Sequence, residues 1–395
     1  MINKRFDEII KDDIYNLISE KIPEGKMLEY KEDLPGPRDQ DKKEFLADIS
    51  SFANSSGGYI VYGIQEERDE KGKATGIPKN ANGIETNNAD AAIRRMEDLV
   101  IHGIDPRISG YRVRAINGFS KGPIILWHIP KSWASPHMVT LQTTSRFYLR
   151  KNGGKYPMDL SEIRSSILSS ETLPEKIRRF RDNRISKIII DETPVPLYQY
   201  PKTVLHIIPI SGLVEKKEID MASIIEKKLR LMPIGAHGYS YRYNLDGLLT
   251  HDRHLEHPYD SYLQLFRNGT IESVNSFWIR PNGNEKYIPS RPILEELIEA
   301  LTAYLDIEKK LDFEPPISIM VSFLWVKDYV IYPGSRVFGS SIAIDRDNLM
   351  LPDVIVEDYG SKKVSDILRP IFDALWQAGG YGRCYHYDES GELKN

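Results

Sequence analysis

The chain has 395 residues, enough for two or three domains of about 150 residues each. It is 41% hydrophobic and 28% charged, a balance that is typical of globular proteins and excludes a disordered, collagen-like or coiled-coil chain. Its formal net charge of −4 gives no general attraction to nucleic acid, so any basic surface must be local.

The cysteine count and the apolar runs restrict the compartment. Cys384 is the single cysteine, which excludes an internal disulfide or an all-cysteine metal site and fits a reducing cytosol. The first residues, MINKRFDEII, lack the apolar core of a signal peptide. The longest apolar stretch, residues 317–326, is too short for a bilayer, which needs about 20 residues. We therefore expect a cytoplasmic protein without membrane contact.

Residues 1–170 alternate between helical and strand patterns, which predicts an α/β domain. A leading helix is expected within residues 1–23, because apolar residues recur there at helical spacing before Pro23. The elements expected after it are a strand over 27–31, a helix over 41–54, a buried strand over 59–64, a helix over 87–100, strands over 111–115 and 123–129, a hairpin at Gly153-Gly154 and a helix over 159–169.

The rest of the chain has a different texture. Residues 171–187 predict a basic helical connector, which is either a solvated linker or a ridge that faces phosphates. Residues 188–395 mix short strand-like runs with helices and predict an α+β region of unassigned fold. This region forms either one domain or two subdomains that divide near residue 289.

Acidic residues surround the first predicted strands. Glu24 lies five residues before Glu29, and Lys31 follows two residues later, on the same face of a strand as Glu29. The buried strand over 59–64 runs directly into Gln65, Glu66 and Glu67. Three carboxylates from such positions are suitable ligands for Mg²⁺ or Mn²⁺, and an adjacent lysine can orient water or screen a phosphate. This set of groups is suited to metal-assisted cleavage of a phosphodiester, although a charged, solvated strand edge would have the same sequence. There is no P-loop motif, so nothing in the sequence supports an ATP site.

Basic residues flank the predicted Gly153-Gly154 turn. They are Arg146, Arg150, Lys151 and Lys155. Backbone N–H groups and cations at such a turn make either a phosphate-binding element or a solvated hairpin tip. Phe147 and Tyr148 are adjacent in a predicted strand and point to opposite faces. One of the two is therefore expected in the core, and the other is available to stack on a base.

Three segments together resemble the Schlafen AlbA_2 domain. They are EYKEDL, EFLADISSFANSSGGYIVYGIQEE and RFYLRKNGGKYPMDLSEIR, and the resemblance spans residues 24–168. It implies a mixed-sheet α/β domain that binds nucleic acid, with RNA favoured over DNA. In Schlafen ribonucleases the pattern is two glutamates five apart, a lysine two residues after the second glutamate, and an acid just after the Gly-Gly strand.

Carried over to this chain, the pattern assigns catalytic roles to Glu24, Glu29, Lys31 and a third acid. The three acids would hold Mg²⁺ or Mn²⁺. The position directly after Gly-Ile is Gln65 here, a departure from the pattern, so the third acid is Glu66 or, alternatively, Glu67. Nucleic acid would be held by Arg146, Arg150, Lys151 and Lys155, with help from Arg178 and Arg179 of the connector.

These observations predict a metal-dependent endoribonuclease that acts on tRNA or another structured RNA and takes part in phage defence. The alternative is a DNA- or RNA-binding regulator without catalysis, in which the C-terminal region is a sensor. Eukaryotic Schlafen cores pair two related lobes, whereas this chain shows one, so the resemblance also implies a homodimer.

Overall fold

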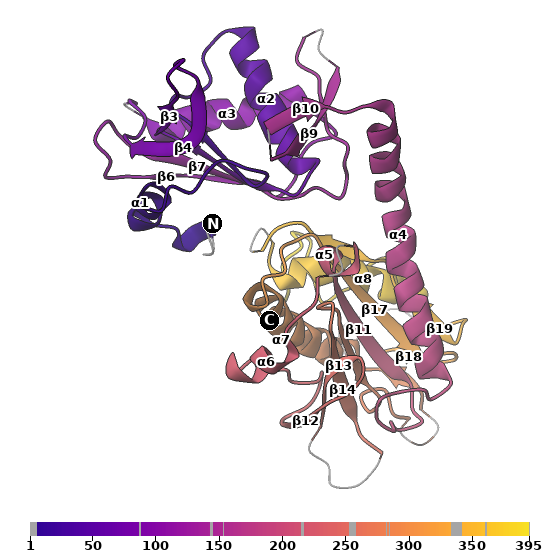
Figure 1. Cartoon of the computed structure of the whole chain (residues 1–395). Helices are drawn as coiled ribbons and strands as arrows, with labels where there is room; N and C mark the ends of the chain where they lie inside the picture. Colours follow the sequence, from indigo (N-terminus) through magenta and orange to yellow (C-terminus); the bar gives the residue numbers. More distant parts are fainter. Residues whose placement is uncertain are drawn as a thin grey trace. The chain divides into compact units, whose positions relative to one another are not determined.

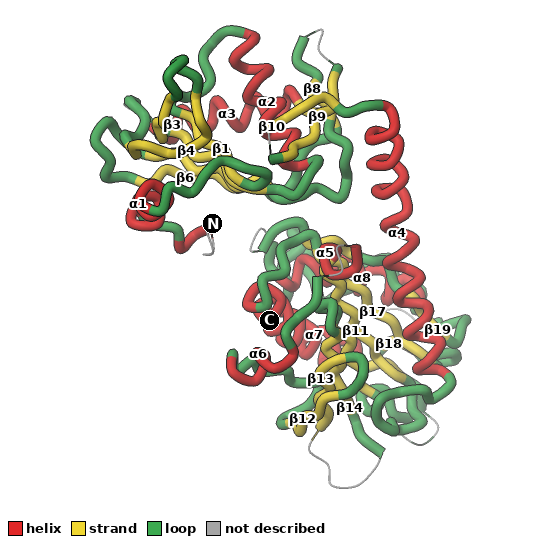
Figure 2. The backbone as a smooth tube through the Cα atoms, in the orientation of Figure 1, coloured by secondary structure: helices red, strands yellow, loops and turns green. Residues whose placement is uncertain are grey.

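The computed structural model describes residues 6–86, 88–142, 145–152, 154–214, 217–252, 258–281, 283, 285–332, 342–359 and 362–394. The chain divides into two compact units, Met1–Pro174 and Glu175–Asn395 (Figure 1). Each unit combines helices with strands, as Figure 2 shows by colour.

A four-stranded mixed sheet forms the centre of the first unit. Its order is β1-β2-β7-β6. The strands are β1 (Leu28–Lys31), β2 (Gly58–Tyr62), β7 (Ile124–Ile129) and β6 (Arg112–Ile116). β1 and β2 run parallel, while β7 is antiparallel to both of its neighbours. The expected mixed sheet is therefore confirmed.

Helices cover both faces of this sheet. On one face, α2 (Asp39–Ala53) and α3 (Ala89–Gly103) pack on Ile60 and Trp127. On the other face, η1 (Phe6–Glu8) and α1 (Lys11–Ser19) pack on Val61 and Leu126, the alternate residues of the same strands. Because alternate residues are apolar on both faces, these strands read as near-continuous hydrophobic runs.

Two smaller sheets complete this unit. One has the order β10-β9-β8-β5, and its strands are β5 (Ile104–Asp105), β8 (Met138–Val139), β9 (Arg146–Lys151) and β10 (Gly154–Pro157). The other is the hairpin of β3 (Ile64–Arg68) and β4 (Ala74–Ala81). Gly153, half of the expected Gly-Gly turn, lies outside the described residues.

Two predicted elements of the first unit are divided. The expected strand over 59–64 breaks at Gly63, whose φ of +99° is accessible to glycine, and the chain continues as β3. The leading helix breaks at Ile9 and Ile10, because the Asp13 carboxylate accepts the Ile10 N–H and starts a new helix there.

The closing helix and the basic connector are one element. This helix, α4 (Leu160–Ile189), continues without interruption past Pro174, the last residue of the first unit. The sequence pattern predicts two elements here, a helix over 159–169 and a basic helical connector over 171–187.

A large antiparallel sheet organises the second unit. Its main path is β12-β13-β14-β15-β11-β17-β19, and β20 also pairs with β17. The strands are β11 (Lys202–Pro209), β12 (Tyr239–Tyr243), β13 (Gly247–Asp252), β14 (Ser261–Phe266), β15 (Ile271–Asn275), β17 (Ile317–Leu324), β19 (Asn348–Met350) and β20 (Val354–Val356). The remaining elements are α5 (Ile210–Val214), α6 (Met221–Glu226), β16 (Tyr287–Ile288), α7 (Ser290–Lys310), β18 (Val330–Ile331) and α8 (Val364–Ala378).

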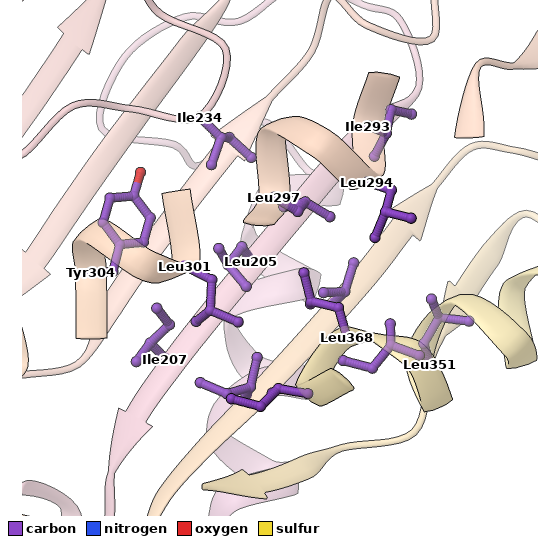
Figure 3. Packing of buried hydrophobic residues seen from close by; sticks show 14 of the residues in the cluster. Leu205, Ile207, Ile234, Ile293, Leu294, Leu297, Leu301, Tyr304, Leu351 and Leu368 are labelled. Atoms are coloured by element: carbon purple, nitrogen blue, oxygen red, sulfur yellow. The ribbon is translucent and has the colours of Figure 1, made fainter. Parts of the chain in front are cut away.

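The two faces of the large sheet have different cover. On one face, Leu297 and Leu301 of α7 lie over Leu205 and Ile207, and α8 adds Leu368 (Figure 3). The opposite face carries a smaller core that includes Ile185 and Ile188 from the end of α4. Residues 175–395 thus form one unit on both sides of residue 289.

A buried ion pair fixes the end of α4 to this sheet. Arg184 donates from Nε and Nη2 to the two oxygens of Glu272, at 2.8 Å each. His206 Nε2 lies 2.9 Å from one of these oxygens, and Tyr262 donates to the other at 2.8 Å. Although burial raises the pKa of Glu272, Arg184 and His206 lower it to about 2. Part of the expected solvent-facing connector is therefore core.

Within the described residues, no helix has the length and apolar character needed to cross a membrane.

Glu308 of α7 predicts an unusual pH dependence of stability. It is fully buried, and neither carboxylate oxygen has a hydrogen-bond partner among the described residues. Burial raises its pKa well above the usual value, against a smaller lowering by Lys217. The folded state therefore keeps this carboxyl protonated where the unfolded chain ionises, and stability falls as pH rises above about 4.5.

The variant Glu308→Gln should lose this dependence and show a flatter stability profile between about pH 5 and pH 8. Urea unfolding at several pH values measures it. Equal slopes for the variant and the wild type would contradict the assignment.

Candidate functional site

β1 brings Glu29 and Lys31 together. Leu28 and Tyr30 point into the core on the α1 side of the sheet, so Glu29 and Lys31 face the side covered by α2. Lys31 Nζ lies 2.7 Å from Glu29 Oε1. The two-residue spacing predicted this shared face correctly.

Arg150 of β9 occupies the other oxygen of Glu29. Its Nη2 donates to Glu29 Oε2, its Nε donates to the Gly25 carbonyl at 3.1 Å, and its guanidinium lies over the Phe52 ring. Arg150 is only 4% exposed. Burial raises the pKa of Glu29, but Lys31 and Arg150 together outweigh burial and hold this pKa below its usual value. Arg150, expected to hold phosphate, is thus committed to Glu29.

Asp48 of α2 extends the same network. It is 1% exposed and lies 2.6 Å from Lys155 Nζ through Oδ1 and 3.5 Å from Lys31 Nζ through Oδ2. Lys155 also lies 3.6 Å from Glu44. Burial lowers the pKa of Lys31, but Asp48 and Glu29 raise it overall, so Lys31 stays positively charged.

Acids and cations therefore alternate in one connected chain of ion pairs. We call it the charge chain, and its members in order are Arg150, Glu29, Lys31, Asp48, Lys155 and Glu44. Sequence reasoning missed Asp48. The signal was its place in α2, three residues after Phe45 and four before Phe52, on the apolar face of the helix.

Glu24 and Glu66 are both hydrogen-bonded to the backbone of Gly76 in β4. The Glu24 N–H donates to the Gly76 carbonyl at 2.7 Å, and the Gly76 N–H donates to Glu66 Oε2 at 2.9 Å. Glu24 Oε1 accepts the Tyr30 N–H at 2.6 Å. Burial, then Glu29 and to a smaller extent Glu66, raise the pKa of Glu24 to about 7, although the Tyr30 amide lowers it.

Glu66 and Glu67 point in different directions. The carboxylate of Glu67 lies 2.9 Å from Lys21 Nζ and is partly exposed. Glu66 is the acid that contributes to the field at Glu24. Both lie inside β3, where the sequence placed them just past the end of a strand. We call Glu24, Glu29 and Glu66 the acidic cluster.

The acidic cluster is not a preformed metal site. Across the described ranges, no three His, Cys, Asp or Glu side chains converge in a way that could hold a metal ion. Carboxylate oxygens are suitable donors for Mg²⁺ or Mn²⁺, but both oxygens of Glu29 are already bonded to cations. The donor chemistry fits a divalent cation, and the observed arrangement does not.

A groove of about 550 Å³ opens beside the charge chain. It is lined by Gln40, Lys43, Glu44, Ala47, Ser145, Arg146, Tyr148 and Lys155. We call it the Lys155 groove. Lys155 belongs both to this groove and to the charge chain, so it links the two.

The other predicted phosphate ligands are not among the residues that line the groove. Lys151 is exposed, packs over the Tyr156 ring and lies 3.9 Å from Glu162. Arg178 and Arg179 are exposed on α4 within the second unit, and Arg179 is paired with Glu175.

Residues 24–159 match the family described as Schlafen, AlbA_2. They form a Schlafen AlbA_2 domain. The matched segment lies within the first unit and contains the acidic cluster, the charge chain and the groove. Similarity also extends to the solution NMR structure of the N-terminal domain of an ATP-dependent DNA helicase RecG-related protein from Nitrosomonas europaea. It has 16% identity and a TM-score of 0.27, and it covers 35% of this chain and 88% of that one. No curated protein matches the chain.

The elevated pKa of Glu24 in the AlbA_2 domain predicts a pH effect on stability. A folded-state pKa of about 7 against an ordinary 4.5 means that the contribution of Glu24 is lost as pH rises through that interval. Glu24→Gln should therefore be more stable than the wild type at about pH 8, by about 1–2 kcal/mol after allowance for solvent screening.

Urea unfolding at about pH 5 and pH 8 measures this difference, with Glu67→Gln as the control for removal of a nearby, partly exposed carboxylate. A difference that does not grow with pH would show that Glu24 titrates normally.

Proposed function

We propose that the AlbA_2 domain binds nucleic acid, with RNA preferred over DNA, through the Lys155 groove. The observation that carries the proposal is the set of groups in this one hollow: the cations of Lys43, Arg146 and Lys155 beside the ring of Tyr148. Cations supply most of the affinity for a phosphate backbone, and an aromatic ring accepts the face of any base.

Within RNA, single-stranded loops and ends are the preferred target because of how their bases are recognised. Splayed bases in loops and ends stack on aromatic rings and present their polar edges to amides. Tyr148 and the amide of Gln40 line the same groove and are suited to these two contacts. The chain as a whole carries a net charge of −4, so the attraction must come from this local surface.

Removal of one groove cation should weaken binding and its salt dependence together. For Arg146→Ala we expect an affinity for unfractionated tRNA that is lower by about tenfold, with a log–log salt slope that is smaller by about one. Fluorescence anisotropy across a salt series measures both quantities.

The control is Lys79→Ala, which removes an exposed lysine of β4 outside the groove. Equal losses for the two variants would show that the binding surface is not this groove.

We also propose, as a second function, that the acidic cluster cleaves RNA with a divalent cation. The observation that favours it is the carboxyl of Glu24, whose pKa is raised first by burial and then by the nearby carboxylates of Glu29 and Glu66. Crowded carboxylates are stabilised by a bound cation, and their perturbed pKa values are typical of functional sites.

In this proposal Glu24 and Glu66 would hold the cation, joined by Glu29 once one of its oxygens is free. The cation would act as a Lewis acid and lower the pKa of a bound water. Lys31, a firm cation beside Glu29, would stabilise charge that develops on the phosphate.

An assay with Mn²⁺, Mg²⁺ or EDTA tests the cleavage proposal on tRNA, total RNA and single-stranded DNA. We expect cutting of RNA that needs metal and that falls by at least about a hundredfold in Glu29→Gln. Glu67→Gln, which changes a partly exposed acid of the same strand as Glu66 that pairs with Lys21, should cut normally.

Two results separate the proposals. Binding that survives EDTA and Glu29→Gln, without any cutting, would leave a binding protein and remove the nuclease. Cutting that is equal in Glu29→Gln and wild type would point to a contaminating ribonuclease and count against the cluster.

A further inference from the structure

Glu29 is the least available carboxylate of the acidic cluster. Lys31 holds one of its oxygens at 2.7 Å and Arg150 holds the other. Because two cations already neutralise Glu29, a metal cation binds it more strongly once one of these partners moves away, and Lys31 has another acceptor within reach. That acceptor is Asp48 Oδ2, which lies 3.5 Å from Lys31 Nζ and has no hydrogen-bond partner among the described residues.

We propose that Asp48 is a positioning residue that couples the Lys155 groove to the acidic cluster. A phosphate that engages Lys155 in the groove weakens the hold of Lys155 on Asp48, Lys31 then moves from Glu29 toward Asp48, and one oxygen of Glu29 becomes free. The inference rests on the proposed nucleic-acid-binding function of the groove and deepens it, because it makes the nucleic acid itself the signal that prepares the acidic cluster.

The geometry supports each step. Lys155 is the closer partner of Asp48, at 2.6 Å, and it also borders the groove, so a phosphate competes for it directly. Asp48 is buried, so the loss of one cation leaves an uncompensated charge that closer pairing with a second cation relieves. Among the described residues, Lys31 is the remaining cation in contact with Asp48.

The coupling has a reciprocal consequence. If an anion in the groove raises the affinity of the cluster for a cation, a cation at the cluster must raise the affinity of the groove for an anion by the same factor. Anion and cation also attract each other through space, so the part carried by Asp48 must be isolated by variants.

Lys155→Gln imitates an occupied groove, because it removes the cation from Asp48 without any nucleic acid. The probe is Mn²⁺ alone, and the concentration of free ion is read by electron paramagnetic resonance. We expect Lys155→Gln to bind Mn²⁺ about tenfold tighter than the wild type, and the same substitution in an Asp48→Asn background to have no effect. Lys79→Gln removes the same charge without contact with Asp48 and should change the affinity by less than about twofold.

A second readout needs neither metal nor RNA. The side-chain ammonium of Lys31, observed by ¹⁵N NMR and assigned with Lys31→Arg, should shift in Lys155→Gln and stay in place in Lys79→Gln. If Asp48→Asn does not fold, this comparison decides the matter alone.

The outcomes separate the coupling from the proposed functions. An unmoved Lys31 signal in Lys155→Gln, or equal gains in Mn²⁺ affinity with and without Asp48, would overturn the coupling. A moved signal with no Mn²⁺ binding in any variant would support the coupling and count against the metal-dependent cleavage.

Discussion

A carboxylate that leaves water needs a cation beside it, and this requirement shapes the AlbA_2 domain from β1 outward. Glu29 lies on the covered face of β1, where burial alone would drive it to hold a proton. Arg150, from a strand more than a hundred residues later, and Lys31, from its own strand, keep it ionised. Lys31 in turn lies near a second buried acid, Asp48, which also pairs with Lys155. The charge chain thus begins with one buried carboxylate, Glu29, and continues through the cation that Glu29 shares with Asp48.

The second unit also contains a buried carboxylate with a cation beside it, Glu272. Glu272 receives two hydrogen bonds from Arg184, one contact from His206 and one from Tyr262, and it is fully buried. No member of that set lines the described groove. Its effect is to fix the end of α4 to the sheet, as expected for a saturated buried ion pair. The charge chain differs because Lys155, one of its members, borders an open groove.

Much of this arrangement follows from spacing in the sequence. The two-residue period placed Glu29 and Lys31 on one face, and helical spacing located α2 and its buried side. The departures have local causes. Gly63 divides a segment that looks like one continuous strand in the sequence. The residues beside it are apolar, so the sequence pattern does not indicate the break. The two helices expected around residue 170 are one helix, α4. Its backbone continues past Pro174, although a proline inside a helix removes one backbone hydrogen bond.

The contacts that decide the chemistry are the ones that sequence cannot supply. The pairing of Arg150 with Glu29 spans 121 residues, and nothing in the local pattern around Arg150 distinguishes it from an exposed phosphate ligand. Asp48 was detectable in principle, since an acid on the apolar face of an amphipathic helix needs a polar or charged partner. The identity of that partner depends on how β10 and α2 pack together, which is tertiary information.

These contacts also set what each proposed function demands of the domain. Nucleic-acid binding needs only the groove and is compatible with the charge chain as it stands, with Glu29 neutralised. Cleavage needs Glu29 to leave one of its cations, at the cost of an unpaired buried charge unless another acid takes that cation. Asp48 has an oxygen without a hydrogen-bond partner near Lys31, so the network already contains the acceptor that the exchange requires. An acidic cluster whose Glu29 is neutralised at rest and released by phosphate in the groove would favour cation binding in the complex with substrate.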